Sequence, residues 1–433
     1  MRVTAFNPAM SAITQSDAYS ELDVGRFAFW ATPFAERDKV FARLRRTDPI
    51  SWQAPPDSLL VAAEDNTQGY WAVTRYKDIR EISRNPTVFS NSEGIFMEDL
   101  PEPVRVGALS FIVMDAPEHT ALRAIVQQAF SPRHMKTLED WTRDQVVDLI
   151  EGIRGNGTAD ICEEFTKQLP GRIFCSFFNI TEPRLMHAAI EGAEQIVSWN
   201  DPDYLSEGIE PIDVFGNAAM TLQEVAFDLA DERRANPGED LMSWVVGAEY
   251  EGRSLEDWEI GGFFTLMAGA ANDTTRHAMA HGLLALQTHP QQKALLLSDI
   301  EAHLDGAVEE ILRWSSVVLH MRRQVMQDYE IGGRLLRAGD KLALFYCSGN
   351  RDEDVFEHPE TFDITRKPNH HMTFGGGGPH FCLGAVLGRQ MLKSALRELF
   401  TRMPDITVGR PAYLESSFMH GIKHLDAVWT PPA

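Results

Sequence analysis

Cys382 is the residue whose surroundings in this sequence most clearly suit chemistry. Four glycines, Gly375–Gly378, come shortly before it, and a helical pattern follows it at once. Glycines let a backbone fold tightly beneath a flat object, where side chains would collide. A helix beginning at Leu383 would point free N–H groups at the sulfur and stabilise a thiolate, a good axial ligand for haem iron. The alternative for an isolated cysteine is a buried small hydrophobe.

A second candidate is the acid–hydroxyl pair Asp273–Thr274 in "AGAANDTTRHAM", within a long and otherwise apolar helical pattern. A buried acid is costly unless it is used or solvated. Because neighbouring residues do not share a helix face, Thr274 could face a ligand while Asp273 faces a chain of waters, especially in a locally widened helix. Ordinary capping, or bonding of the hydroxyl back to the helix, is the alternative.

A third candidate is the pair Glu310 and Arg313 in "VEEILRWSS". A spacing of three places both charges on one helix face and favours an ion pair. Such pairs are common and are usually solvated, so the spacing alone does not indicate a site.

Together these motifs resemble those of the cytochrome P450 family. "GGGGPHFCLG" is similar to the family's cysteine-ligand loop. The resemblance implies haem b as cofactor, with Cys382 as its thiolate ligand, His380 on a haem propionate and Gly384 as the glycine after the ligand. One departure concerns the aromatic residue that usually packs near the sulfur. Phe374 stands eight residues before the cysteine, and Gly375 occupies the usual seventh place.

The resemblance also implies roles for the helical motifs. Thr274 would steady dioxygen at the iron, and Asp273 would relay the protons that drive O–O cleavage. Ala271 stands where the family usually has glycine, which would narrow the oxygen groove. A structural ion-pair brace around the haem would be formed by Glu310, Arg313 and Arg366. The remaining propionate contacts would come from "MDAPEHTALRAIVQQAFSPR" and "MRRQVMQDYEIGG", namely His119, Arg123 and Arg323.

Four segments would form a substrate pocket by the same resemblance. Its residues would be Ile95, Phe96, Leu109, Phe264, Met267, Ala268, Val317, Val318, Leu319, Phe418, Met419 and Ile422. Because most of them are apolar, a hydrophobic substrate is favoured. His320 and His420 could bond a substrate hydroxyl or carbonyl, or could equally lie at the surface. "SSFMHGIKHL" resembles the C-terminal loop of bacterial soluble P450s that act on steroid side chains, branched lipids and terpenoids.

The implied function is a haem-thiolate monooxygenase that uses O2 to hydroxylate a terpenoid, steroid or branched lipid. One alternative is a hydroxylase of an aromatic or fatty-acid substrate. Another is a haem-thiolate isomerase or dehydratase that does not use O2, against which Asp273–Thr274 argues. A non-catalytic haem sensor would normally add a signalling or DNA-binding segment, and the sequence indicates none.

The two electrons would come from outside, since no GxGxxG follows a predicted strand. The resemblance implies an iron–sulfur ferredoxin with its reductase as the donor. An acidic ferredoxin would dock on the cysteine side, where a basic patch is predicted. The patch would consist of Arg123, Arg133, Arg389 and Lys393.

Composition favours one large protein of a single domain, 1–433, without repeats or linkers. The chain has 44% hydrophobic and 24% charged residues and a formal net charge of −23, which argues against general nucleic-acid binding. Its four cysteines are widely spread, as in reduced intracellular proteins. Without an apolar run of ~20 residues or a targeting pattern at the N-terminus, we expect a cytoplasmic monomer with no membrane anchor.

These residues must be positioned by mainly α-helical elements with a minor β region. A P450 fold would place the haem between a long central helix and the cysteine-ligand loop. The central helix is predicted from about 255 to 287, with Ser254 as its N-cap, and a further helix spans roughly 306–315. Strands are predicted near 71–73 and within 323–347, and the last strong helix follows Cys382.

Overall fold

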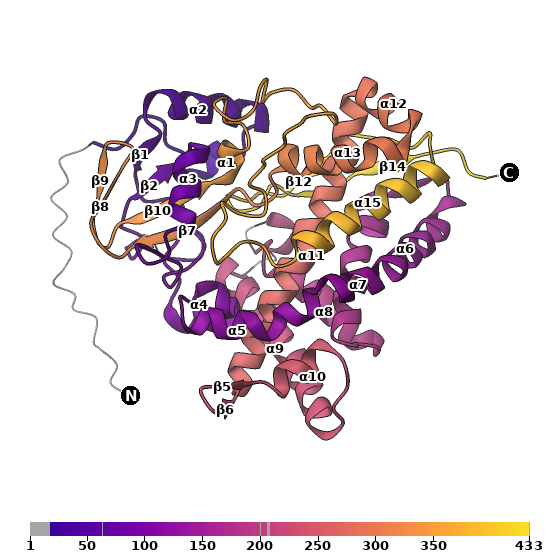
Figure 1. Cartoon of the computed structure of the whole chain (residues 1–433), viewed down its shortest axis with the longest axis horizontal. Helices are drawn as coiled ribbons and strands as arrows, with labels where there is room; N and C mark the ends of the chain where they lie inside the picture. The colour runs from indigo at the N-terminus through magenta and orange to yellow at the C-terminus, as the bar shows by residue number, and fades with distance from the viewer. Residues whose placement is uncertain (1–17, 63, 200, 206–207, 433) are drawn as a thin grey trace.

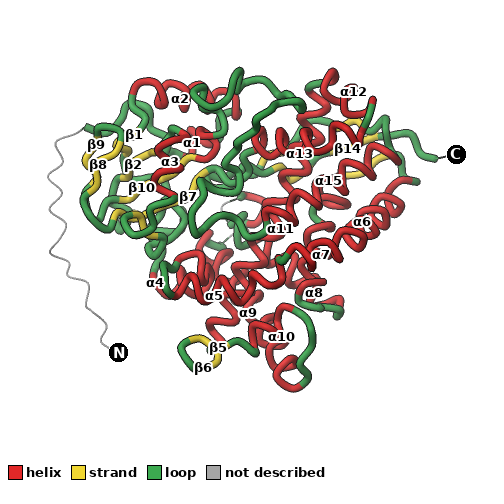
Figure 2. The backbone as a smooth tube through the Cα atoms, in the orientation of Figure 1, coloured by secondary structure: helices red, strands yellow, loops and turns green. Residues whose placement is uncertain are grey.

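Helices make up most of the molecule, and the larger sheet lies toward one side of it, as Figure 1 and Figure 2 show. The computed structural model describes residues 18–432 apart from 63, 200, 206 and 207, and the side chains of 103, 128, 132–134, 137 and 204 also lie outside that description. The prediction of a mainly α protein with a minor β region is confirmed.

The α-helices are α1 (Phe27–Trp30), α2 (Phe34–Thr47), α3 (Tyr76–Ser83), α4 (Glu102–Leu109), α5 (Glu118–Gln127), α6 (Pro132–Arg154), α7 (Gln168–Phe177), α8 (Pro183–Gln195), α9 (Pro211–Ala235), α10 (Leu241–Val246), α11 (Asp257–Thr288), α12 (Pro290–Ser298), α13 (Ile300–Ser315), α14 (Tyr346–Gly349) and α15 (Ala385–Arg402). A π-helical turn, Cys162–Thr166, precedes α7.

The strands are β1 (Ile50–Gln53), β2 (Tyr70–Val73), β3 (Phe89–Ser90), β4 (Thr158–Asp160), β5 (Glu249–Tyr250), β6 (Arg253–Ser254), β7 (His320–Val325), β8 (Tyr329–Ile331), β9 (Arg334–Leu336), β10 (Lys341–Phe345), β11 (Thr407–Val408), β12 (Ala412–Tyr413), β13 (Ile422–His424) and β14 (Asp426–Val428).

The largest sheet has the order β1-β2-β10-β7-β3, with β2 and β10 parallel and the other neighbours antiparallel. Alternate residues of its strands face two separate apolar clusters. Tyr70 and Ala72 of β2 belong to a cluster with residues of α1 and α2, whereas Trp71 and Val73 belong to a cluster with residues of α3. The sheet is therefore covered on both faces, and its apolar strands are buried for that reason.

Helix α11 runs through the helical part of the molecule and packs against α4, α7, α8, α9, α13 and α15. Most of its residues are buried, which explains an apolar composition on nearly all sides. The prediction of Ser254 as N-cap was wrong. Ser254 lies in β6, and Glu256 forms a capping box with Glu259 because each carboxylate accepts a backbone N–H of the other residue.

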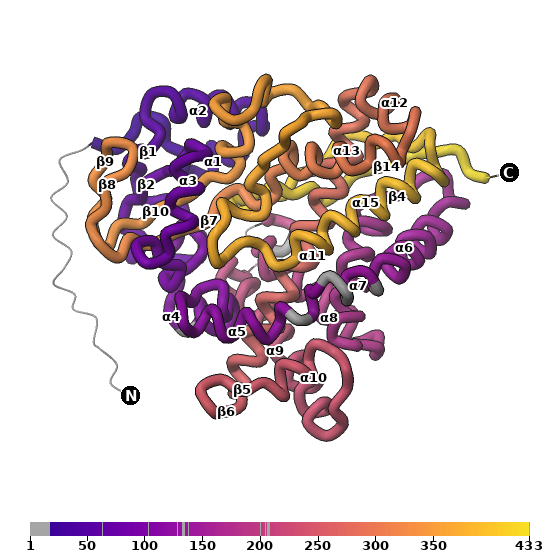
Figure 3. The backbone as a smooth tube through the Cα atoms, in the orientation of Figure 1, coloured from indigo at the N-terminus to yellow at the C-terminus, as the bar shows by residue number. Residues whose placement is uncertain are grey.

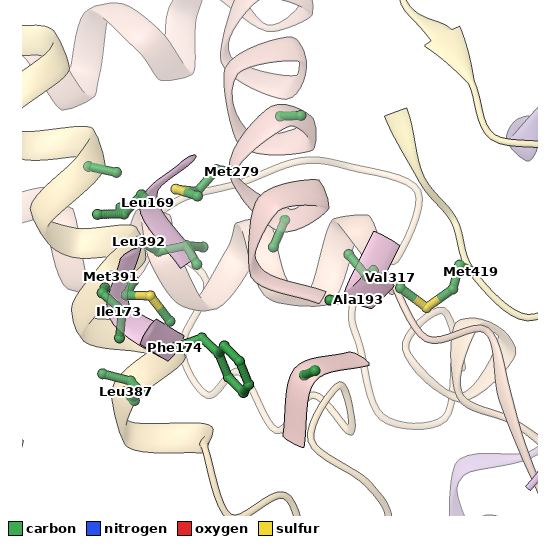
Figure 4. Packing of buried hydrophobic residues seen from close by; sticks show 14 of the residues in the cluster. Leu169, Ile173, Phe174, Ala193, Met279, Val317, Leu387, Met391, Leu392 and Met419 are labelled. Atoms are coloured by element: carbon green, nitrogen blue, oxygen red, sulfur yellow. The ribbon is translucent and has the colours of Figure 1, made fainter. Parts of the chain in front are cut away.

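The largest apolar cluster joins α11 to its neighbours. Figure 4 shows members of this cluster from α7, α11 and α15 (Leu169, Ile173, Met279, Leu387, Met391 and Leu392). The colours of Figure 3 show that these elements come from distant parts of the sequence. Helices from the middle and the end of the chain thus hold α11 in place. In the described residues, none of the helices is both long and apolar enough to cross a membrane.

Candidate active site

The glycines before Cys382 fit closely against the end of α3. A Cβ on Gly376 would lie 2.4 Å from the Ser83 hydroxyl oxygen, and one on Gly378, at φ +78°, would lie 2.1 Å from the Ser83 carbonyl oxygen. Both positions therefore require glycine. The glycines allow close packing against protein backbone, a reason that was not evident from the sequence.

Cys382 follows this loop but does not start the next helix. Its N–H donates to the Phe374 carbonyl at 3.0 Å, and α15 begins at Ala385 with Gly384 as N-cap, two residues later than predicted. The side chain of Cys382 is exposed, unlike those of the other three cysteines. Desolvation by the surrounding protein raises the pKa of its thiol, while the N–H of Gly384 and the charges of Arg123 and Arg389 lower it. A bound metal ion removes the proton of a coordinating thiol, so a haem iron at Cys382 would be held by a thiolate.

Phe374 lies beside the same loop despite its unusual place in the sequence. The Arg389 guanidinium lies 4.4 Å from the centre of its ring, and a Cβ on Gly388 would lie 3.9 Å from the ring edge. Phe374 is thus held between the cysteine loop and α15.

The middle of α11 carries one accessible stripe in an otherwise buried helix. Met267, Ala271 and Thr274 are partly exposed and Ala270 is exposed, and these positions recur at steps of three and four. Small side chains at Ala270 and Ala271 would let a flat group lie close to this face. Thr274 is the polar member of the stripe, and its hydroxyl donates to the Ala270 carbonyl at 3.0 Å.

Asp273 points away from this stripe into a buried ionic network. It is 1% exposed, and its Oδ1 lies 2.8 Å from Arg276 Nε. The contact is an ion pair that is not aligned as a hydrogen bond, because neither oxygen of Asp273 accepts a hydrogen bond from the described residues. Burial raises the pKa of Asp273 to about 7. Helix α11 is α-helical throughout, without the local widening that the sequence suggested.

The network continues from Asp273 toward the surface. Arg276 Nη1 donates to Glu194 Oε1 of α8 at 2.6 Å, and Glu194 Oε2 lies 2.7 Å from Lys167 Nζ. Lys167 in turn pairs with Glu191 and Glu163, whose side chains are 35% and 40% exposed. Arg276, Glu194 and Lys167 were not predicted from the sequence. The one signal available was the spacing of three between Asp273 and Arg276.

The predicted ion-pair brace forms a complete buried cluster. Glu310 and Arg313 are 0% exposed and make a two-pronged ion pair, with Nε–Oε2 at 2.9 Å and Nη2–Oε1 at 2.7 Å. Arg366 Nε lies 3.2 Å from Glu310 Oε2. The two arginines also donate to the backbone carbonyls of Asn350, Glu357, His358, Pro359 and Thr361. The cluster fixes the segment before the cysteine loop to α13.

The four residues expected at the haem propionates gather in one place. The rings of His119 and His380 lie 4.1 Å apart, and His380 is close enough to Arg323 and Arg123 for their charges to lower its pKa. Burial is the larger cause, and the pKa of His380 falls to about 2. Neither arginine has an acidic partner among the described residues, and His119 Nε2 lacks a hydrogen bond. This donor set near Cys382 fits a ligand with two carboxylates, as haem has.

Several predicted pocket residues come together in one wall. The rings of Phe96 and Phe418 meet edge to face at 4.7 Å, and Val318 bridges to Met419 through the backbone. The Val317 carbonyl accepts the N–H of His420 at 2.7 Å, which is a second link between the segment after α13 and the C-terminal segment. Ile95, Leu109 and Ile422 are buried in the large apolar cluster of the helical core, which extends well beyond this wall. The wall therefore joins the loop before α4, the segment after α13 and the C-terminal segment.

Three predicted pocket residues lie elsewhere. Phe264 is 0% exposed and packs edge to face on Phe174 and Phe178 of the α7 region, and Ala268 is also fully buried. Leu319 belongs to the cluster around α1 and α2. Met267, by contrast, lies on the accessible stripe. The apolar pattern of α11 could not separate these faces, because nearly every face of this helix is buried.

The two histidines considered for substrate contact are both buried. His320 is 1% exposed and lies between Phe345 and Phe418. His420 stacks on Phe34 at 4.5 Å and uses Nδ1 for a bond with the Ser315 carbonyl. His420 is thus committed to the fold, and a surface position is excluded for both.

The basic patch predicted on the cysteine side is largely neutralised. Arg389 Nε pairs with Glu309 at 2.6 Å and Lys393 with Asp305 at 2.5 Å. Arg123 donates to the Phe381 carbonyl at 2.6 Å, and Arg133 lies outside the described side chains. The groove beside α6, α13 and α15 is lined by equal numbers of acids and bases, which are Glu139, Asp140, Glu301, Asp305, Arg143, Arg389, Lys393 and Arg397.

Comparison with known proteins points to one family. A sequence profile described as cytochrome P450 matches residues 215–403. A methyl-branched lipid omega-hydroxylase of Mycobacterium tuberculosis is 40% identical over 417 residues, which cover 95% of each protein. A steroid C26-monooxygenase of Rhodococcus jostii is 34% identical, covering 91% of this chain and 82% of the relative.

A solved structure agrees with these relatives. A Mycobacterium marinum cytochrome P450 in complex with pseudoionone is 42% identical and superimposes with a TM-score of 0.91, covering 95% of this chain and 99% of the other.

Proposed function

The chain belongs to the cytochrome P450 family and is a haem-thiolate monooxygenase of hydrophobic substrates, and we propose that it hydroxylates the terminal carbon of a methyl-branched lipid chain. The observation that carries this proposal is the 40% identity, over 95% of the chain, to a methyl-branched lipid omega-hydroxylase. The apolar wall around Phe96 and Phe418 supports a substrate of this kind, because such walls bind apolar chains.

The steroid C26-monooxygenases provide a second candidate substrate. The end of a steroid side chain is itself methyl-branched, so both candidates present the same chemical group. The two candidate substrates then differ in the rest of their structure, which is a flexible chain in the lipid and a rigid ring system in the steroid.

The residues gathered beside Cys382 would hold the cofactor. Cys382 would supply the thiolate ligand, and His119, Arg123, Arg323 and His380 would bind the two carboxylates. When bound, the haem would supply the activation of O2, one atom of which is inserted into the substrate. The buried carboxylates of haem need such partners, and the arginines in turn gain the acidic partners that the described residues do not provide.

Asp273 and Thr274 on α11 would hold and transfer protons beside the cofactor. Thr274 presents a hydroxyl on the accessible stripe and holds its orientation by donating to Ala270. Asp273, with a pKa of about 7, can exist with and without its proton near neutral pH. Arg276 and Glu194 hold the carboxylate of Asp273 inside the fold, and Lys167 connects them to the surface.

A ferredoxin with its reductase would deliver the two electrons, to a protein that works as a cytoplasmic monomer. Arg389 and Lys393 are already paired with acids of this chain, so they do not form a uniformly basic surface that would attract an acidic donor. The exposed apolar side chains of Phe381 and Val386, 42% and 53% exposed, lie on the cysteine side and would form the contact.

Val386→Asp tests this docking surface. We expect ferredoxin-supported turnover to fall about tenfold, because a charge at an apolar contact weakens binding, while the substrate-induced Soret shift is unchanged. Val428→Asp is the matched control, since Val428 is also 53% exposed but lies on β14. Equal turnover of the two variants would contradict the proposed contact.

A matched pair of substrates tests the proposed reaction. 15-Methylhexadecanoic acid and unbranched heptadecanoic acid contain the same number of carbons. We expect the branched acid to give a blue Soret shift at about tenfold lower concentration and to be hydroxylated at its terminal carbon. Equal responses to the two acids, or oxidation in the middle of the chain, would contradict the proposal. Cholest-4-en-3-one serves as the steroid candidate in the same assay.

A further inference from the structure

One wall of the proposed substrate pocket is a loop that is buried although it has no regular secondary structure. Ile95–Asp99, named the wall loop here, contains no helix or strand, and Ile95, Phe96, Met97 and Glu98 are each at most 5% exposed. Loops normally run over the surface, because the carbonyls of a buried loop need hydrogen-bond donors from elsewhere in the fold. The wall loop must therefore be held by specific partners.

Lys341 is one such partner. It is the first residue of β10 and is 1% exposed, which is unusual for a lysine. Its Nζ donates to the Met97 carbonyl at 3.1 Å and to Asp99 Oδ2 at 2.5 Å. The ammonium group thus bridges the backbone and the end of the wall loop.

Arg322 of β7 is the second partner and is 3% exposed. Its Nη1 donates to the Glu98 carbonyl at 3.0 Å and lies 2.6 Å from Asp99 Oδ1, and its backbone N–H donates to the Ile95 carbonyl at 2.9 Å. Because β7 and β10 are paired neighbours, the two cations reach the wall loop from one sheet.

Asp99 closes this arrangement by pairing with both cations. Burial opposes its ionisation, but Arg322 and Lys341 hold its pKa below the usual value. Glu98 is the other acid of the wall loop, and burial raises its pKa to about 7. Lys341 and Arg322 are almost fully buried, whereas Asp99 is 37% exposed. Apolar residues at the two buried positions would often be at least as stable, so a role in fixing one conformation is a better reason for the two cations than stability is.

The wall loop meets the rest of the pocket through Phe96. The Phe96 ring packs on Phe418 at 4.7 Å, and the Phe418 carbonyl accepts the N–H of Leu319 at 2.9 Å. The two cations hold the backbone after Phe96, at Met97 and Glu98, and the backbone N–H of Arg322 holds it before Phe96, at Ile95. The position of Phe96 therefore depends on Lys341 and Arg322.

We propose that Lys341 and Arg322 form a clamp that fixes the wall loop against Phe418 and so determines which hydrophobic chain the enzyme accepts and which carbon it oxidises. The two cations are positioning residues, since they act through Phe96. This inference rests on the proposed function, because it takes the wall loop as part of the substrate pocket.

Lys341→Met in the holoenzyme tests the clamp, because methionine keeps the volume and removes the charge and the donor. We expect about tenfold weaker affinity for 15-methylhexadecanoic acid in Soret titrations, and products that spread from the terminal carbon to inner carbons. Imidazole, which needs only the haem iron, should bind as it does to the wild type. Lys39→Met on α2, where the lysine side chain is 71% exposed, is the control and should match the wild type.

Asp99→Asn is the second variant, in case Lys341→Met does not fold. It keeps the donors to the wall-loop carbonyls, so we expect a smaller change in the same direction and faster hydrogen exchange at residues 95–99. Wild-type affinity, product pattern and exchange in a folded variant would overturn the clamp. If the wild type itself neither bound nor oxidised the branched lipid, the proposed function would be wrong and the clamp would remain testable. Hydrogen exchange at residues 95–99 needs no substrate and would still show whether the clamp holds the wall loop.

Discussion

Two buried ion pairs on different helices share one sequence pattern, an acid followed three residues later by an arginine. In α13 the pair is Glu310–Arg313, and in α11 it is Asp273–Arg276. Glu310 accepts hydrogen bonds from two arginines, one backbone N–H and one amide side chain. Asp273 accepts none from the described residues, and its pKa is raised to about 7.

The role of a buried carboxylate depends on how many hydrogen bonds it accepts. A buried carboxylate whose hydrogen-bonding capacity is filled keeps its charge and braces the fold. A buried carboxylate that is under-satisfied exchanges its proton near neutral pH and marks a functional site. We therefore expect the same residue pattern to give a structural brace in one helix and, as proposed, a proton-handling group in the other.

Removing the charge of the brace should have the largest effect. Glu310→Gln leaves Arg313 and Arg366 without a buried counter-charge, which typically costs about 3–5 kcal/mol. We expect little folded holoenzyme, measured as the yield of the 450 nm band of the reduced CO complex. Glu360→Gln, at a side chain that is 72% exposed, is the control and should give the wild-type yield. A wild-type yield of the 450 nm band from Glu310→Gln would contradict a bracing role for Glu310.

Neutralising the other acid should leave the fold intact and impair turnover. Asp273→Asn keeps the shape of a group that is already partly protonated at pH 7, so we expect the full 450 nm band. Product formation should fall about 100-fold, the usual contribution of a general acid or base. Loss of the 450 nm band in this variant would show that Asp273 is structural, like Glu310.

The pH dependence of stability should distinguish Asp273 as well. Its pKa in the folded protein, about 7, exceeds the ordinary value of 3.8, so ionisation opposes folding. This cost is absent below pH 3.8 and complete above pH 7, and stability should fall as pH rises through that window. Urea unfolding of the wild type and Asp273→Asn at several pH values measures it. Parallel curves for the two proteins would contradict the raised pKa.

Glu194→Gln should produce a smaller change in the same network. The negative charge of Glu194 helps to raise the pKa of Asp273, so its removal should lower that pKa and move the pH profile of turnover toward acid. We expect a several-fold loss of turnover at pH 7, with the control Glu191→Gln within twofold of the wild type because Glu191 is partly exposed. An unchanged profile in Glu194→Gln would separate α8 from the proton-handling group.

Much of the fold and the site was predictable from sequence because motifs with fixed spacing carry local geometry. The long helix around Asp273, the helix of Glu310 and the strand near Trp71 all formed, although helix starts moved by a few residues where caps such as Glu256 and Gly384 decided them. Arg276 with Glu194, and Lys341 with Met97, were not found. These partners are distant in sequence or involve backbone carbonyls, so no spacing in the sequence predicts them.

The most direct test of the central claim is the amount of product formed per O2 consumed, measured with 15-methylhexadecanoic acid in the wild type and Thr274→Ala. Thr274 carries the hydroxyl of the accessible stripe on α11 and directly follows Asp273, the acid proposed to handle protons. The role proposed for Thr274 predicts close coupling in the wild type and, in Thr274→Ala, O2 consumption that yields mainly peroxide. Full coupling of O2 consumption to hydroxylation in Thr274→Ala would contradict it.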